Sequence, residues 1–354
     1  MKVVSVIQIQ WRGPMSNIKV IGIDLAKDVF QLHGTDAKGK QVLSKRLNRQ
    51  TLTECITQLQ PCLIGIEACM GAFYWARVFK TMGHTVKIMA PQFVKPYVMA
   101  NKNDRNDARG IAEAVTRPDM KFVAVKSVEQ QDVLLLHRVR EQLMKQKTAQ
   151  VNQIRGLLME YGVVIPKGIK HMNTLTEILE NNEEKLTPKA IVIFKQMHEQ
   201  FKIYEQQIAL YDKEIAQDVA QNSVCKEIMK IDGVGPITAS AIVATVGDAK
   251  EFKNGRQMAA WLGLTPKQHS SGNTIRLSGI SKRGDCYVRK LLVHGARSIV
   301  NTCQKKTDKK SKWVADKKNR IGYNKTSVAL ANKNARTIWA IMATGECYRA
   351  PIAA

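Results

Sequence analysis

The chain has 354 residues, 44% of them hydrophobic, and carries 55 Lys or Arg against 30 Asp or Glu, a formal net charge of +25. This length suits about two domains with a sizeable core, and the apolar content excludes a disordered polycation. The sequence has neither the roughly 20 consecutive apolar residues of a membrane span nor a signal-peptide pattern, so we expect a soluble cytoplasmic protein.

The first part of the chain predicts an α/β domain. Residues 1–16 have no clear hydrophobic period and end in Gly-Pro, which indicates a loosely attached extension and leaves Met1 and Met15 as alternative starts. The following block, residues 17–126, alternates strands and helices. Strands are expected at residues 18–24, 28–34, 41–47, 63–67 and 85–90, and helices at residues 51–59 and 72–82. Two adjacent strands followed by strand–helix alternation predict a mixed sheet.

The middle of the chain, residues 127–223, predicts a helical arm. Apolar residues recur at three- and four-residue steps over 128–161 and again over 188–222, with a break at residues 162–168. Two long helices joined by a loop favour a coiled-coil arm used for oligomerisation or for spacing domains. A plain helical subdomain is the alternative.

The C-terminal part, residues 224–354, reads as basic, Gly-punctuated and mostly α-helical. From Lys250 onward there are 22 Lys or Arg and 5 Asp or Glu, so a net charge of +17 lies in the last third of the chain. A folded chain this basic favours a polyanionic partner, with nucleic acid ahead of a membrane surface. A ribosomal-type basic tail fits the charge equally well.

The seven cysteines point to no covalent framework. Their number is odd and none forms a C-x-x-C pair, so neither a disulfide scaffold nor a zinc ribbon is favoured. We expect buried free thiols in a reducing compartment.

Four carboxylates form the first candidate site. Asp24 and Glu67 end two buried strands, and Asp104 and Asp107 lie three residues apart at a helix start. Four such groups in one pocket would repel unless cations neutralised them, and all-oxygen ligands suit Mg²⁺ or Mn²⁺. Two ions could clamp the attacking and leaving oxygens of a phosphodiester. Singly, each acid is explained as well by a turn, a cap or the helix dipole.

A Gly-rich turn at residues 231–247 is the second candidate. Gly233 and Gly235 permit close backbone approach, and Pro236 suits a first helical turn, so the segment resembles a helix–hairpin–helix element that offers backbone N–H groups to phosphate. A tight turn between packed helices explains the pattern equally well.

A polar segment at residues 261–292 is the third candidate. It holds Ser270, Ser271 and Gly272 in an expected loop, with His269 close by. A serine can attack a phosphodiester if cations offset the developing charge. The cations that follow, which we expect to bind nucleic acid together with Gly233 and Gly235, are Arg276, Lys282, Arg283, Arg289 and Lys290. Without other support, serines in loops are usually ordinary loop residues.

Three phrases join these candidates into one resemblance. GIDLAKDVFQLHG (22–34), MAPQFVKPYVMANKNDRNDA (89–108) and WLGLTPKQHSSG (261–272) resemble the DEDD-type insertion-sequence transposases with a catalytic serine, the IS one-ten family and its eleven-eleven subgroup. Related Piv-type DNA invertases share the plan. The resemblance runs from about residue 18 to about residue 344.

The resemblance implies an N-terminal domain of RNase-H/RuvC-like fold with Asp24, Glu67, Asp104 and Asp107 as metal-binding catalytic acids. It implies a C-terminal transposase domain whose nucleophile is Ser271; many relatives have an acid where Ser270 stands. It further implies donor and target DNA as substrates, a bridge-type guide RNA, a tetramer built as a dimer of dimers through the arm, and a bacterial, nucleoid-associated location.

Three hypotheses follow. The leading one is a serine-dependent DNA recombinase with an Mg²⁺-assisted acid site. The second is a RuvC-like junction nuclease that hydrolyses DNA without a covalent intermediate. The third is a basic nucleic-acid-binding scaffold without enzymatic activity, which the common order of four acids and a serine segment disfavours.

Overall fold

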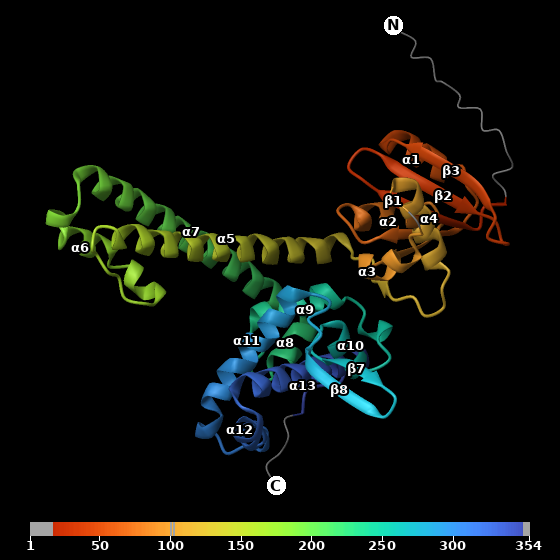
Figure 1. Ribbon diagram of the computed structural model, residues 1–354. Helices are drawn as coiled ribbons and strands as arrows, with labels where there is room; N and C mark the ends of the chain where they lie inside the picture. Colours follow the sequence, from red (N-terminus) through yellow and green to blue (C-terminus); the bar gives the residue numbers. More distant parts are fainter. Residues whose placement is uncertain (1–16, 100, 102, 350–354) are drawn as a thin grey trace, which may run out of the picture. The chain divides into compact units, whose positions relative to one another are not determined.

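The computed structural model describes residues 17–99, 101 and 103–349, and the chain divides into two compact units, residues 1–126 and 127–354 (Figure 1). The N-terminal extension predicted at residues 1–16 lies outside the described residues. The helical arm belongs to the same unit as the C-terminal part of the chain. None of the described helices combines the length and the apolar content needed to cross a membrane.

The described part of the first unit is built on a six-stranded mixed sheet in the order β3-β2-β1-β4-β5-β6. The strands are β1 (Val20–Leu25), β2 (Phe30–Thr35), β3 (Gln41–Leu47), β4 (Leu63–Glu67), β5 (Thr85–Met89) and β6 (Phe122–Val123). β1 pairs antiparallel with β2 and parallel with β4, and β5 pairs parallel with β4. The predicted mixed sheet is confirmed.

Helices pack against both faces of this sheet. The helices are α1 (Arg49–Thr57), α2 (Ala72–Thr81), α3 (Pro91–Val94), the 3-10 turn η2 (Lys95–Tyr97) and α4 (Asp104–Val115). Ile21 and Ile23 of β1 share a buried cluster with residues of α1 and α2. Gly22, between them, faces the opposite side because strand residues alternate. A Cβ at Gly22 would lie 2.2 Å from the Ala108 carbonyl oxygen, so its missing side chain lets α4 lie directly on the sheet.

The second unit begins with the two long helices α5 (Val128–Met159) and α7 (Pro188–Gln221), which lie side by side (Figure 1). Ion pairs join Arg140 to Asp212 and Lys147 to Glu205, so numbers rise along one helix as they fall along the other, and the pair is antiparallel. Shorter elements at the end of the arm are η3 (Ile169–Met172), α6 (Leu175–Glu180) and η4 (Glu183–Lys185). The two predicted long helices are therefore present.

The remainder of the second unit surrounds a single apolar core. Its helices are α8 (Ser223–Met229), α9 (Pro236–Val246), η5 (Ala249–Glu251), α10 (Gly255–Trp261), α11 (Cys286–Thr302), η6 (Cys303–Lys305), α12 (Lys309–Ile321) and α13 (Tyr323–Thr344). A two-stranded hairpin of β7 (Pro266–Ser271) and β8 (Thr274–Ile280) interrupts them. The predominantly helical character predicted for this part is confirmed.

Two expectations were wrong. Ser270 and Ser271 lie in strand β7 and not in a loop. Nearly every residue of the hairpin is exposed. Strand β7 has no alternation of apolar and polar positions, and in β8 the alternation is short, with Ile275 and Leu277 between polar residues. The seven cysteines are free thiols, as expected, but Cys69, Cys286 and Cys347 are exposed instead of buried.

Candidate active site and family

Asp24 and Glu67 meet at one edge of the sheet. They stand at or near the carboxyl ends of β1 and β4, which are parallel neighbours, and each is half-buried. Asp24 is two residues from Gly22, and Glu67 is two residues from Gly65, so each acid shares a face of the sheet with that glycine. A Cβ at Gly65 would press on Val115 of α4. The two carboxylates therefore lie on the face that α4 covers.

The thiol of Cys69 reports their combined charge. Its sulfur lies 3.8 Å from the Leu25 carbonyl oxygen, immediately after β1. Desolvation of the thiol, followed by the negative charges of Asp24 and of Glu67, raises the pKa of Cys69 to about 11. Asp24 and Glu67 thus both lie close enough to Cys69 to disfavour its thiolate, in addition to the larger effect of desolvation.

Asp104 and Asp107 lie in the first turn of α4. The Asn103 side chain caps this helix by accepting a hydrogen bond from the Asn106 N–H at 2.9 Å. Asp104 is exposed and Asp107 is half-buried. Among residues 17–99, 101 and 103–349, no three His, Cys, Asp or Glu side chains are close enough together to hold a metal ion. The structure thus brings Asp24 and Glu67 together and sets the other two acids on the covering helix, while the four-ligand metal site stays a prediction.

His33 is a residue on this face that the sequence did not single out. It pairs with Gly22 across β1 and β2 and is 5% exposed. Its Nδ1 has no hydrogen-bond partner within the described part of the chain. Burial, then the charges of Arg109 and Arg105 on α4, lower the pKa of His33. The first turns of α4 therefore lie near β2, and the imidazole is neutral at pH 7.

The β7–β8 hairpin separates the two candidate serines onto opposite faces. Ser271 pairs with Thr274, and His269 pairs with Arg276, so these four side chains share one face. Ser270 pairs with Ile275, placing it on the other face, where its oxygen accepts a hydrogen bond from Gln268 Nε2 at 3.0 Å.

The face that carries Ser270 is also apolar, because Ile275 is 71% exposed there and Leu277 64% exposed. Ser271 therefore has a cation and an imidazole on its face, whereas Ser270 has hydrocarbon. The sequence could not make this distinction because the two serines are adjacent.

The predicted nucleic-acid-binding cations fall into two groups. Arg276, Lys282 and Arg283 are exposed on or just after β8. Arg289 instead donates from Nη1 to the carbonyl oxygens of Leu262 and Arg283, at 3.0 and 3.1 Å. Arg289 therefore holds the base of the hairpin.

Lys290 is also engaged within the protein. Its ammonium pairs with Glu141 of α5 and lies 5.0 Å from the centre of the Tyr287 ring. Of the five predicted cations, Arg276, Lys282 and Arg283 are therefore the most available to bind nucleic acid, because Arg289 and Lys290 contact other parts of the protein.

The Gly-rich turn is a helical hairpin between α8 and α9. Gly233 has φ +85°, and a Cβ there would lie 2.8 Å from the Gly295 carbonyl oxygen of α11. Close backbone packing accounts for Gly233 without a phosphate. A Cβ at Gly235 would meet open space, so packing does not require this glycine, and Pro236 begins α9.

Comparisons with known proteins agree with this organisation. A DEDD transposase family of the IS110 type matches residues 21–163, and the family described as "Transposase IS116/IS110/IS902 family" matches residues 225–312. The chain is 44% identical to the Coxiella burnetii transposase for insertion sequence element IS1111A, over 96% of this chain and 93% of that protein. The chain belongs to the IS110/IS116 family of transposases.

Other relatives of this transposase have similar coverage. It is 44% identical to a family 20 transposase of Pseudomonas aeruginosa, over 94% of this chain and 99% of the relative. It is 36% identical to the transposase for insertion sequence element IS1328 of Yersinia enterocolitica, over 94% and 99%. As a transposase, the protein is a DNA-cutting enzyme. The first matched range contains the four acids and the second contains both serines.

Proposed function

We propose that this insertion-sequence transposase cuts and rejoins DNA strands through a covalent phosphoserine on Ser271. The observation that carries the proposal is the exposed hairpin face on which Ser271 stands with His269 and Arg276. A nucleophile, a proton acceptor and a cation on one accessible face are the groups that attack on a phosphodiester requires. The sheet order of the first unit fits an RNase-H/RuvC-like fold, which we propose for that unit.

The proposed cleavage step balances with these groups. The Ser271 oxygen attacks the scissile phosphorus, and the bond from phosphorus to the DNA 3′ oxygen breaks. The serine proton passes to the His269 imidazole, and the departing 3′ oxygen takes a proton from solvent. The Arg276 guanidinium offsets the negative charge that develops on the phosphorane. In rejoining, a 3′-hydroxyl attacks the phosphoserine and restores the Ser271 hydroxyl, so bond energy is conserved.

Asp24, Glu67, Asp104 and Asp107 are the ligands we propose for Mg²⁺ or Mn²⁺. Their donors are hard carboxylate oxygens, and the charges of Asp24 and Glu67 both add to the desolvation that raises the pKa of Cys69. Mg²⁺ commonly takes one or two protein carboxylates and completes its shell with water and substrate phosphate, so a pair of acids is a sufficient anchor. The bound ion would supply Lewis-acid polarisation of the scissile phosphate.

The partners we propose are donor and target DNA, a bridge-type guide RNA and further copies of this chain, as a tetramer. The net charge of +25 supports polyanionic partners. Exposed apolar side chains along the arm, such as Leu135, Val192 and Leu210, support its pairing with a second copy.

A covalent-adduct assay tests the mechanism. The purified protein is incubated with Mg²⁺, DNA of the element ends and RNA transcribed from the element's flank, and the products are separated on a denaturing gel. We expect a protein–DNA band that disappears in Ser271→Ala and persists in Ser270→Ala, its matched neighbour on the opposite hairpin face.

Each alternative gives a different result. Strand cleavage that continues in Ser271→Ala without an adduct would refute the phosphoserine and leave a RuvC-like hydrolase that uses water. Loss of cleavage in Asp24→Asn with normal DNA retention would support the acid site. If neither variant alters DNA products, the chain acts as a scaffold.

A further inference from the structure

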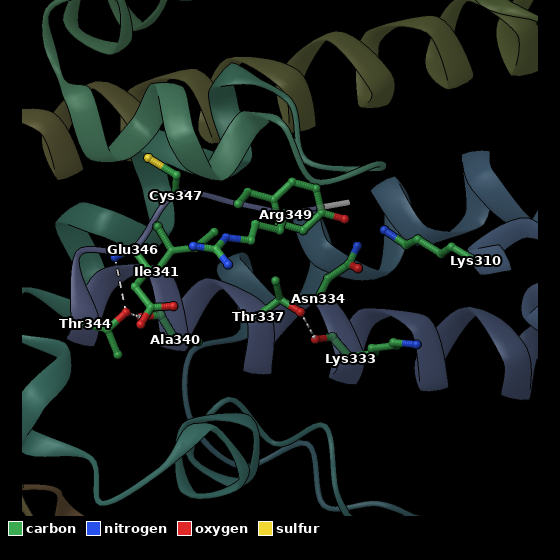
Figure 2. Close-up of a pocket in the computed structure, with 11 residues that line it drawn as sticks. Lys310, Lys333, Asn334, Thr337, Ala340, Ile341, Thr344, Glu346, Cys347 and Arg349 are labelled. Carbon is green, nitrogen blue, oxygen red and sulfur yellow. Dashed lines mark hydrogen bonds between the residues drawn. The ribbon is translucent and has the colours of Figure 1, made fainter. Parts of the chain in front are cut away.

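A basic pocket of about 270 Å³ lies in the second unit (Figure 2). Lys310 of α12 lines one part of it, one face of α13 forms another, and the segment that follows α13 completes it. No part of the proposed transposition chemistry uses these residues.

The charge of the pocket lining is net positive. Lys310, Lys333 and Arg349 contribute cations, and Glu346 is the carboxylate among the lining residues. In Figure 2 the Lys310 ammonium points toward Asn334, while Glu346 lies at the far end of the pocket. An anion placed beside Lys310 would therefore meet positive charge.

Lys310 is unusual because its ammonium is buried. Its side chain is 6% exposed, and Asp232 Oδ2 is 3.8 Å from its Nζ. The same aspartate also pairs with Lys306 at 3.4 Å, so one carboxylate is shared by two ammonium groups. Burying an ammonium is costly, and burial, together with the charges of Lys333 and Lys306, lowers the pKa of Lys310 against the opposing effects of Asp232 and Asp308. Three ammonium groups therefore act here against two carboxylates, and a ligand anion in the pocket would balance the remaining positive charge.

The pocket also adjoins the Gly-rich turn. The Asp232 carbonyl oxygen accepts hydrogen bonds from Asn334 Nδ2 at 3.0 Å and from Lys310 Nζ at 3.5 Å. Asp232 immediately precedes Gly233, so two pocket residues fix the backbone of this turn.

The pocket's size and lining select the ligand class. Its volume is just below the roughly 300–1,000 Å³ of pockets for drug-sized molecules, which suits a single nucleotide unit. Ala340 and Ile341 add an apolar wall, and the Thr337 hydroxyl donates to the Lys333 carbonyl oxygen at 3.1 Å. Cations on one side and hydrocarbon on another suit a phosphate joined to a sugar.

We infer that this pocket binds one phosphate and its sugar from an unpaired nucleic-acid strand, with Lys310, Lys333 and Arg349 holding the phosphate. The strand is DNA or RNA, and the chemistry recognised is common to both. The choice of a nucleic acid over a free phosphate compound rests on the proposed function, whereas the anion site itself does not.

The test places a carboxylate in the pocket. Thr337→Glu puts a negative charge within the lining, where it can pair with Lys310 and preserve folding; Thr337→Gln is the matched neutral control. Binding of fluorescent ten-nucleotide DNA and RNA strands is measured by anisotropy over a range of salt concentrations, with inorganic phosphate as competitor. We expect about tenfold weaker binding in Thr337→Glu only, with the salt slope reduced by about 0.7, the contribution of one single-strand phosphate.

A second measurement locates the strand on the wild-type protein. Acylation of Lys333 by an amine-reactive ester is followed by mass spectrometry, with exposed Lys325 on the same helix as the internal control. We expect either strand to slow the acylation of Lys333 and to leave the acylation rate of Lys325 unchanged. The strand that protects Lys333 more strongly, DNA or RNA, is identified as the occupant.

The outcomes are distinguishable from failure of the transposition mechanism. Equal affinity and slope in the two Thr337 variants, with Lys333 unprotected, would overturn the pocket even if the Ser271 adduct forms normally. Protection by inorganic phosphate as strong as by the strands would overturn the nucleic-acid assignment. A Thr337→Glu defect in a protein that forms no adduct would support the pocket and count against the phosphoserine mechanism alone.

Discussion

The buried His137 makes the second unit sensitive to acid. His137 lies in α5 and is 1% exposed; its Nδ1 is 3.1 Å from the Tyr287 hydroxyl and its Nε2 is 3.0 Å from Ser240 Oγ. Burial, then the charge of Arg140, lowers the pKa of His137 to about 4, against the opposing effect of Asp212. The folded protein therefore keeps this imidazole neutral where the unfolded chain, with a pKa near 6.5, binds a proton.

The sign and size of the effect follow from linkage. Between pH 6.5 and pH 4 the unfolded chain holds the extra proton, so stability is fully present above pH 6.5 and falls as the pH drops toward 4. Each pH unit in that window costs about 1.4 kcal/mol, so the loss at pH 4.5 is about 2 to 3 kcal/mol. Urea unfolding at pH 8 and pH 4.5, with limited proteolysis to separate the two units, measures the free energy of unfolding of the second unit.

The variant His137→Gln keeps a polar side chain that cannot titrate. It should be destabilised at pH 8, because one hydrogen bond to Tyr287 or Ser240 is lost, by about 1 kcal/mol. Its additional loss at pH 4.5 should be smaller than that of the wild type by about 2 to 3 kcal/mol. Equal acid sensitivity in the two proteins would refute the argument, as would an NMR titration that gives His137 a pKa near 6.5.

Three further predictions follow from packing and charge. Gly22→Ala should lower the stability of the first unit by about 1–3 kcal/mol or more, because its Cβ would meet the backbone of α4. Thermal unfolding of that unit measures the loss. Arg289→Gln should increase protease cleavage around residues 263–284 with little change in the salt dependence of DNA binding, whereas Arg276→Gln should lower the salt slope by about 1. Alkylation of Cys69 should be slow at pH 8, because its pKa is about 11, and should accelerate when Mg²⁺ neutralises the adjacent carboxylates.

The glycine and cysteine predictions each have a control. Gly156→Ala, in an open position of α5, should be neutral or stabilising by up to about 1 kcal/mol, and equal losses in both glycine variants would contradict the packing argument. For the thiol, exposed Cys286 reports general effects of the metal ion on the reagent. The Cys69 alkylation rate is measured over Mg²⁺ concentrations that saturate cleavage. A rate that does not respond to Mg²⁺ in that range would show that Asp24 and Glu67 do not bind the ion.

Much of the secondary structure depends on residues that are neighbours in the sequence, so the sequence predicts it. Strands β3 and β4 and the starts of α5 and α7 coincide with the predicted ranges because apolar runs, Pro188 and the capping residue Ser127 act over a few neighbouring residues. The positions of Asp24 and Glu67 at or near strand ends follow from the same patterns. Their convergence depends on the parallel pairing of β1 with β4, which the tertiary structure shows.

Other features depend on contacts between residues distant in the chain, and only the tertiary structure decided them. Strand β7 has no apolar period to predict it, and its pairing with β8 decides which side chains stand beside Ser271 and which stand beside Ser270. The packing of Gly233 against Gly295, the engagement of Lys290 by Glu141 and the burial of Lys310 beside Asp232 each join residues more than 60 positions apart. Composition determined that the protein is basic and favours polyanions. Folding determined which cations form contacts within the protein and which stay exposed to bind a nucleic acid.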